Sequence, residues 1–164
     1  MLVVADTSPI NYLILIQHEM LLPTLYTQVL IPPAVLRELE DPETPEPVRT
    51  WVAHPPAWFE MRAPEQPLAA TALPALGAGE REAIVLAEEL QADFLLIDER
   101  DGRRAARNRA LAVIGTLGVL EEAATRGLID LPTALTRLQT TTFYTPLALF
   151  QTLLARDAER KRQP

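Results

Sequence analysis

Short apolar runs typical of buried β-strands alternate with helical patterns along most of this chain. The predicted strands are residues 2–5, 29–31, 58–62, 94–97 and 111–114. Apolar residues at helical spacing predict helices over 10–16, 34–40, 48–53, 80–91, 103–109, 132–139 and 146–160, and one that follows the turn at 115–118 and ends near 127. Strands that alternate with helices predict a three-layer α/β/α fold with a central parallel sheet.

Proline and serine mark where the first two helices begin. Ser8 is a good N-cap with Pro9 at the first helical position, and Pro32 and Pro33 open the second helix. This reading leaves Asp6 at the carboxyl end of the first strand and puts Glu38 in the second turn of its helix.

Composition limits the class of protein. The chain has 164 residues with 48% hydrophobic content, which suits one domain over 1–164 with a sizeable core. It has no cysteine, which excludes disulfides, thiolate zinc sites and cysteine nucleophiles, and its two histidines lack metal-ligand spacing. No basic segment precedes the first apolar run, and no apolar stretch reaches the roughly 20 residues of a membrane span, so we expect a soluble, cytoplasmic protein.

Two proline-rich segments, 41–47 and 64–74, are predicted to be surface loops within this domain. The aromatic residues beside them, Trp51, Trp58 and Phe59, could stack on bases, but packing against the core is the favoured reading. A basic run at 156–162 is expected to form a short frayed tail after the C-terminal helix.

Acidic residues stand at the edges of these predicted elements. Asp6 and Asp98 each follow a strand, and ligands of open α/β sheets bind at the carboxyl ends of strands. Glu38, Glu80 and Glu82 lie on helices that could face the same edge. Carboxylates are ligands for Mg²⁺ or Mn²⁺, and together with such an ion they can activate a water for attack on a phosphodiester. Taken singly, each acid could instead be a helix-start, turn or solvated residue.

The order of these motifs resembles the PIN-domain family. Asp-Thr-Ser follows the first strand, Val-x-x-Glu-Leu lies on the next helix, Gly-Glu-x-Glu-Ala-Ile opens another helix, and Leu-Leu-Ile-Asp ends a strand. Ile-Gly-Thr-Leu-Gly-Val-Leu at 114–120 is similar to the prokaryotic branch that includes the VapC-type toxins. The resemblance spans about 1–128 and implies a Mg²⁺- or Mn²⁺-dependent ribonuclease, a homodimer, and a small antitoxin protein as partner.

Carried over residue by residue, the resemblance assigns catalytic and metal-binding roles to Asp6, Glu38 and Asp98. The third acid is ambiguous, because Glu80 and Glu82 lie roughly 200° apart on one helix. Glu82, directly before Ala-Ile, is slightly favoured, and Glu80 is the alternative. The frequent Thr-x-Asp form is replaced at the fourth position by Leu-Ile-Asp-Glu, so roles for Glu99 and Asp101 stay open.

A basic run after Asp98 is the strongest candidate for substrate contact. Guanidinium groups make bidentate contacts with phosphates, although this run could equally be a solvated face paired with nearby acids. The net charge of −7 argues against a protein that binds nucleic acid over its whole surface, but it allows a local basic surface. Thr7 and Ser8 would add hydroxyl groups at the site. The predicted substrate-binding residues are Thr7, Ser8, Arg100, Arg103, Arg104 and Arg107.

The leading hypothesis from sequence is a metal-dependent endoribonuclease that binds RNA and could be a toxin held by an antitoxin. The alternative is a catalytically weak PIN-like module that binds nucleic acid or protein. A phosphatase acting on small molecules is disfavoured because the chain has no Gly-rich phosphate cradle and only one lysine, Lys161.

Overall fold

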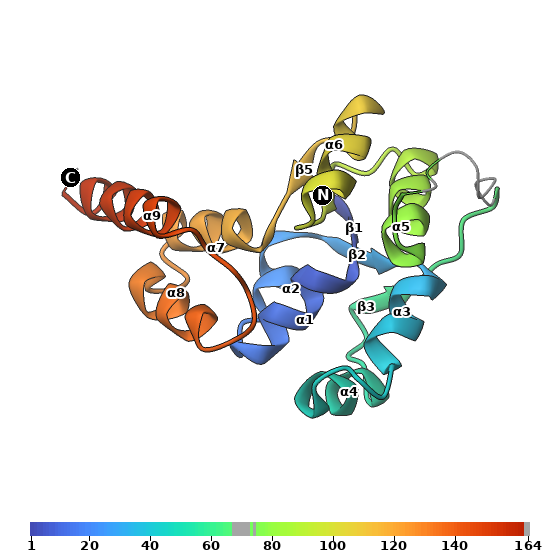
Figure 1. Cartoon of the computed structure of the whole chain (residues 1–164), viewed down its shortest axis with the longest axis horizontal. Helices are drawn as coiled ribbons and strands as arrows, with labels where there is room; N and C mark the ends of the chain where they lie inside the picture. Colours follow the sequence, from blue (N-terminus) through green and yellow to red (C-terminus); the bar gives the residue numbers. More distant parts are fainter. Residues whose placement is uncertain (67–72, 74, 163–164) are drawn as a thin grey trace.

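The computed structural model describes residues 1–66, 73 and 75–162 and contains a five-stranded parallel sheet with helices on both faces (Figure 1). This confirms the predicted α/β fold. The strand order is β3-β2-β1-β4-β5, so the first strand lies at the centre. The strands are β1 (Leu2–Ala5), β2 (Gln28–Ile31), β3 (Phe59–Met61), β4 (Phe94–Leu96) and β5 (Val113–Ile114).

Helices cover the two faces of the sheet and complete the three layers. Alternate residues of β1 point to opposite faces, so that Val3 and Ala5 join one core and Val4 joins the other. None of the described helices is long and apolar enough to cross a membrane. The helices are α1 (Thr7–Leu15), α2 (Leu21–Leu25), α3 (Pro33–Glu40), α4 (Glu46–Ala53), α5 (Ala78–Glu89), α6 (Arg100–Asn108), α7 (Thr116–Thr125), α8 (Leu131–Gln139) and α9 (Leu147–Arg160).

The two cores differ in the elements that fill them. The larger core packs α1, α2, α7 and α8 against one face, and its fully buried side chains include Leu13 and Leu22. The smaller core packs α5 and Ala106 of α6 against the other face, with Ile84 and Leu95 at its centre. Because β1 and β4 are covered on both faces, they read in the sequence as continuous apolar runs.

The first helix begins earlier than its sequence suggests. α1 starts at Thr7 with Asp6 as the N-cap residue, so the prediction of Ser8 as N-cap was wrong. The side chain of Asp6 makes no capping hydrogen bond, and this frees its carboxylate for the edge of the sheet. α6 also begins one turn early, at Arg100, and the short helix α2 was not predicted. The predicted loop at 64–74 falls largely outside the described residues.

The aromatic residues beside the first loop pack together rather than facing solvent. Trp51 lies with its ring centroid 5.0 Å from that of Phe59 and 5.7 Å from that of Trp58. All three contact the larger core, so the packing interpretation of these residues is confirmed.

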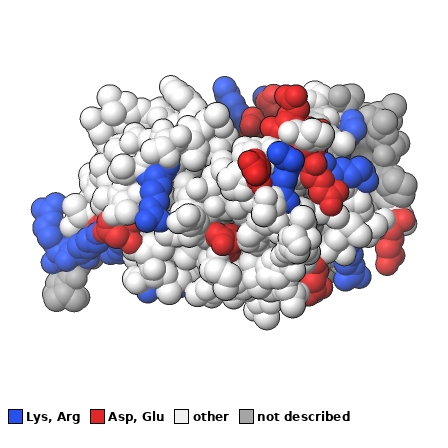
Figure 2. Space-filling model, turned by 90° about the horizontal axis from the view of Figure 1, so that it is seen from below, with Lys and Arg blue, Asp and Glu red and all other residues white. Residues whose placement is uncertain are grey.

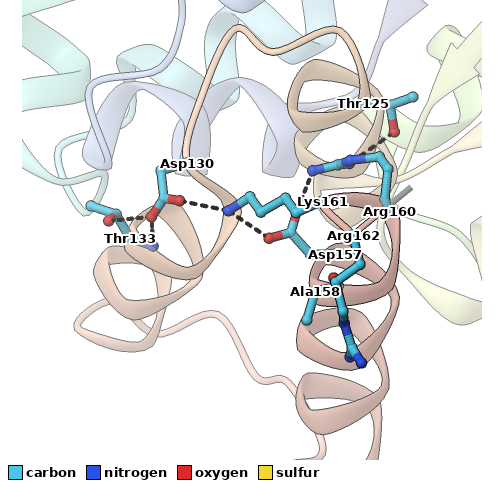
Figure 3. Close-up of polar contacts among 8 residues, drawn as sticks. All are labelled: Thr125, Asp130, Thr133, Asp157, Ala158, Arg160, Lys161 and Arg162. Carbon is cyan, nitrogen blue, oxygen red and sulfur yellow. Dashed lines mark hydrogen bonds and ion pairs between the residues drawn. The ribbon is translucent and has the colours of Figure 1, made fainter. Parts of the chain in front are cut away.

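Most of the basic C-terminal run belongs to helix α9, which ends at Arg160. The run is held by ion pairs as far as Lys161, so the expected frayed tail is not observed there. Asp157 is only 3% exposed and accepts hydrogen bonds from Arg160 and Lys161, and Lys161 also reaches Asp130 at 2.9 Å (Figure 3). The acid at position 157 therefore gives this run a fixed place. It ties the end of α9 to the start of α8.

We expect Asp157→Asn to destabilise the protein, because it removes the carboxylate charge that two cations share. Breaking a fully buried pair costs roughly 3–5 kcal/mol, and the half-exposed cations reduce this to about 2 kcal/mol. Thermal or urea unfolding would measure the loss, with the exposed Glu159→Gln as the matched control. Equal stability of the two variants would show that the ion pairs do not anchor α9.

Candidate functional site

The pairing of β1 with β4 brings two acids of distant sequence position to one edge of the sheet. Ala5 is in register with Leu96, and the amide of Asp6 donates to the carbonyl of Leu96 at 2.9 Å. Because the strands are parallel, Asp6 and Asp98 both leave the sheet at its carboxyl edge, as predicted. This edge is the base of the candidate site.

Asp6 is the most buried acid of the site. Its side chain is 3% exposed, and its Oδ1 atom has no hydrogen-bond partner in the structure. The pKa of Asp6 is raised to about 7, chiefly by burial; a hydrogen bond from the amide of Thr7 opposes the rise, and the charges of Glu80, Glu38 and Asp98 add to it. A buried carboxylate oxygen without a partner is unfavourable unless something positively charged reaches it.

Glu38 reaches the site from the second turn of α3 and is held at both oxygens. The hydroxyl of Thr7 donates to its Oε2, and the amide of Gly79 donates to its Oε1 at 2.9 Å. A Cβ atom on Gly79 would lie 2.6 Å from Oε2 and 2.8 Å from Oε1 of the same carboxylate. The lack of a side chain at position 79 therefore makes room for Glu38.

Glu80 and Glu82 point to different surroundings, as their separation on α5 requires. The Oε2 atom of Glu80 accepts from the amide of Gly77 at 2.9 Å, and a Cβ on Gly102 would lie 2.6 Å from its Oε1. Burial raises the pKa of Glu80, and the charges of Glu99, Glu38 and Asp101 add to this effect. Glu80 is therefore part of the acidic cluster.

Glu82 is directed at the start of α3 instead. It accepts from the amide of Ala34 at 2.8 Å, where the helix dipole favours a negative charge. Its other oxygen lies 3.5 Å from a guanidinium nitrogen of Arg37. Glu82 is absent from the charges that raise the pKa of Asp6, whereas Glu80 is foremost among those charges.

Asp98 is oriented by the start of α7. The amide and the hydroxyl of Thr116 donate to its Oδ1 and Oδ2, each at 2.7 Å, and Thr116 is fully buried. Burial raises the pKa of Asp98, while these bonds and the charge of Arg103 oppose that rise. A Cβ on Gly115 would lie 2.8 Å from Oδ1, so this glycine gives the carboxylate its space.

The predicted substrate arginines divide into different environments on α6. Arg103 lies at the site and donates to the carbonyl of Ile97 at 2.9 Å. Arg104 pairs with Asp101 at 3.0 Å, as expected for a solvated helix face, whereas Arg109, just past the end of α6, pairs with Glu88 of α5 at 2.6 Å. Arg100 and Arg107 are exposed on the same helix. On the face drawn in Figure 2, acidic and basic side chains are interspersed rather than gathered into one basic surface.

The hydroxyl residues after Asp6 have separate surroundings. Thr7 bonds Glu38, whereas Ser8 lines a hollow shared with Asp98 and Glu99. Sequence reasoning did not identify Thr116, Gly77 or Gly102 as parts of the site. The Gly-Thr pair at 115–116, which begins a helix after a strand, is the one sequence signal that could have pointed to Thr116.

The residues at this edge have the character of a divalent-cation site. Within the described ranges, no three acids or histidines converge closely enough to share one ion as they stand. The donors are all carboxylate oxygens, which suit Mg²⁺ or Mn²⁺, and the buried Oδ1 of Asp6 has no partner. Burial raises the pKa of Asp6, Glu80 and Asp98, and the charges of neighbouring acids add to each rise. A cation would relieve this repulsion, so the residues fit such a group.

We expect the protein without divalent cation to lose stability as the pH rises from about 4 to about 7. Over this range unfolded Asp6 is ionised while folded Asp6 keeps its proton, so the folded state binds more protons. The loss should be on the order of a few kcal/mol, and Asp6→Asn should remove most of it. Melting temperatures in EDTA across this pH range would measure both proteins. A wild-type stability that rises over the same range would contradict the buried, raised pKa of Asp6.

Comparisons with known proteins place the chain in a family. Searches of characterised proteins and of solved structures gave no significant match. The model of a family described as PIN domain (DUF3368) matches residues 2–159, nearly the whole chain. PIN domains are typically metal-dependent nucleases that use divalent cations. The parallel sheet, the acids at its carboxyl edge and this match agree, and the chain belongs to the PIN-domain family.

Proposed function

We propose that the chain is an endoribonuclease that depends on Mg²⁺ or Mn²⁺ and hydrolyses RNA phosphodiester bonds. The observation that carries this proposal is the partnerless Oδ1 of Asp6, a carboxylate whose pKa is raised to about 7 by burial first and then by the charges of nearby acids. A protein without a use for such a cluster would be more stable with fewer buried carboxylates.

The proposed cation ligands are Asp6, Glu38, Glu80 and Asp98, with Glu80 in place of Glu82. A bound ion would supply Lewis-acid activation of water and neutralise charge on the phosphate. Thr7 and Thr116 act as positioning residues, because each fixes the carboxylate of one acid by a hydrogen bond. Glu82 supports the start of α3 instead.

Arg103 is the arginine best placed to hold an RNA phosphate. It borders the same hollow as Asp98, and its guanidinium interacts with the charge of that acid. Arg104 is engaged by Asp101, so its contribution to binding should be smaller. The exposed Arg100 and Arg107 could contact the backbone of a longer RNA.

A role as the toxin of a toxin–antitoxin pair is part of the proposal, with a small antitoxin protein and a second copy of the chain as partners. The resemblance to VapC-type proteins supports both. The rival function, a PIN-like module that binds without cleaving, would use the same surface with no metal-dependent product.

Cleavage of a mixed set of structured and single-stranded RNAs in Mn²⁺, Mg²⁺ or EDTA tests the function. We expect products only with metal, and none from Asp6→Asn/Asp98→Asn. Glu80→Gln should lower the rate by roughly 100-fold or more, because it removes charge that stabilises the ion. Glu82→Gln should change the rate by less than about threefold, since Gln still accepts from Ala34.

Two results would count against this assignment. A folded wild-type protein that gives no metal-dependent product would favour the binding module. A Glu82→Gln variant that loses cleavage while Glu80→Gln keeps it would return the third ligand to Glu82.

Gly79→Ala should lower RNA cleavage without a comparable change in the stability of the protein. The added methyl would displace the carboxylate of Glu38, so we expect cleavage to fall by about tenfold or more. Stability should change little, because the preference of a helix for alanine over glycine, about 0.5–1 kcal/mol, offsets the hydrogen bonds that Glu38 loses. The neighbouring Ala78→Gly is the matched control, with the opposite pattern of lower stability and unchanged cleavage. Parallel loss of both properties in Gly79→Ala would contradict this reading.

A further inference from the structure

The loop between α8 and α9, residues 140–146, presents an exposed aromatic ring beside the acids. Tyr144 is 82% exposed, more than any other large hydrophobic side chain in the described part of the chain. Exposure of one aromatic ring is common, so its meaning depends on what holds it and what lies next to it.

The backbone of this loop is fixed by contacts to α1. The ring of Phe143 meets the ring of Tyr12 edge-on at 4.9 Å, and the hydroxyls of Tyr12 and Thr142 lie 3.0 Å apart. The amide of Phe143 donates to the hydroxyl of Thr141 at 3.1 Å. Phe143 is therefore an anchor, and the next residue, Tyr144, is held in place without being buried.

Two hollows lie beside this pair of aromatic residues, and both include Asp98. The smaller, of about 290 Å³, also contains Ser8, Glu99 and Thr142. The larger, of about 480 Å³, also contains Arg103 and Arg156. Phe143 and Tyr144 line both hollows, so the exposed ring stands between two spaces that reach one acid of the proposed metal centre.

We propose that Tyr144 is a base-stacking platform that selects single-stranded RNA, an inference that rests on the proposed nuclease function. A chain whose phosphate lies at Asp98 would place a neighbouring nucleotide in one of the two hollows. An unpaired base can then turn its face onto the ring of Tyr144. Bases of a duplex are already stacked and paired, and they cannot offer that face.

The surroundings of the ring favour RNA as the occupant. The hollows are continuous with an acid of the metal centre, and the larger contains Arg103, which could contact a phosphate beside a stacked base, and Arg156, which pairs with Glu121 of the same hollow at 3.1 Å. Stacking uses the π-face that all bases share, so Tyr144 should favour unpaired over paired RNA with little preference for sequence.

Binding in Ca²⁺, in place of the Mg²⁺ or Mn²⁺ proposed for cleavage, tests this inference apart from cleavage, because a phosphate beside Asp98 needs a cation to offset the repulsion between them. The probe is a mixed-sequence single-stranded oligoribonucleotide with 2-aminopurine at successive positions, beside its duplex. We expect the wild type to prefer the single strand and to quench 2-aminopurine at a defined position. Tyr144→Ala should lose that quenching and bind about tenfold more weakly, and Tyr144→Phe should keep both. Leu147→Ala, at an exposed residue outside both hollows, is the matched control and should behave as the wild type.

Each other outcome overturns the inference. Equal affinity of the wild type for the duplex, unchanged quenching in Tyr144→Ala, or equal loss in Leu147→Ala would exclude a stacking role and leave the ring to a protein partner. Cleavage by the wild type with any of these results would keep the nuclease function. Loss of quenching in Tyr144→Ala, without cleavage by the wild type, would keep the stacking role and reject turnover.

Discussion

The burial of Asp6 among half-buried carboxylates is the constraint on which the candidate site depends. The parallel pairing of β1 and β4 forces Asp6 and Asp98 to one edge, where burial keeps the charge of Asp6 from being solvated. The fold tolerates this because the remaining acids are fixed by donors from their neighbours, Thr7 for Glu38 and Thr116 for Asp98. Oδ1 of Asp6 is fully buried without a partner, and that oxygen is where a cation would have the largest effect.

Three glycines leave space for the carboxylates of the site, just as two threonines orient those carboxylates by hydrogen bonds. Gly79, Gly102 and Gly115 each lie where a Cβ atom would approach a carboxylate oxygen of Glu38, Glu80 or Asp98 within 2.8 Å. None of the three has a positive φ, so the backbone itself does not require glycine there. Glycine is required there because a side chain would collide with the acids. The starts of α5, α6 and α7 are thereby packed against the carboxylates of one site.

The sequence was sufficient for the fold because its signals are local. Buried strands of a parallel sheet are continuous apolar runs, and an acid that follows such a run lies at the sheet edge whichever helices cover the faces. The third acid was not predictable in this way. Glu80 and Glu82 differ only in their rotation about α5, which depends on how α5 packs on α3 and α6. The Ser-Pro pair at 8–9 placed the start of α1 two residues late, because the N-cap residue is Asp6 although its side chain makes no capping hydrogen bond.

The exposure of an aromatic side chain also depends on tertiary contacts that the local sequence does not show. Trp51 and Trp58 are the largest rings in the sequence, which favoured packing over base stacking for both, and they do pack against the larger core. Tyr144 carries no local signal, because its exposure follows from Phe143, whose ring is held by Tyr12 from the far end of the chain. Tertiary contacts decide whether an aromatic ring is buried or exposed. Rings that could contact substrate are therefore expected on loops that are held in place beside the acids of the site. In this fold that meeting occurs at Asp98, which makes the α8–α9 loop part of the functional surface.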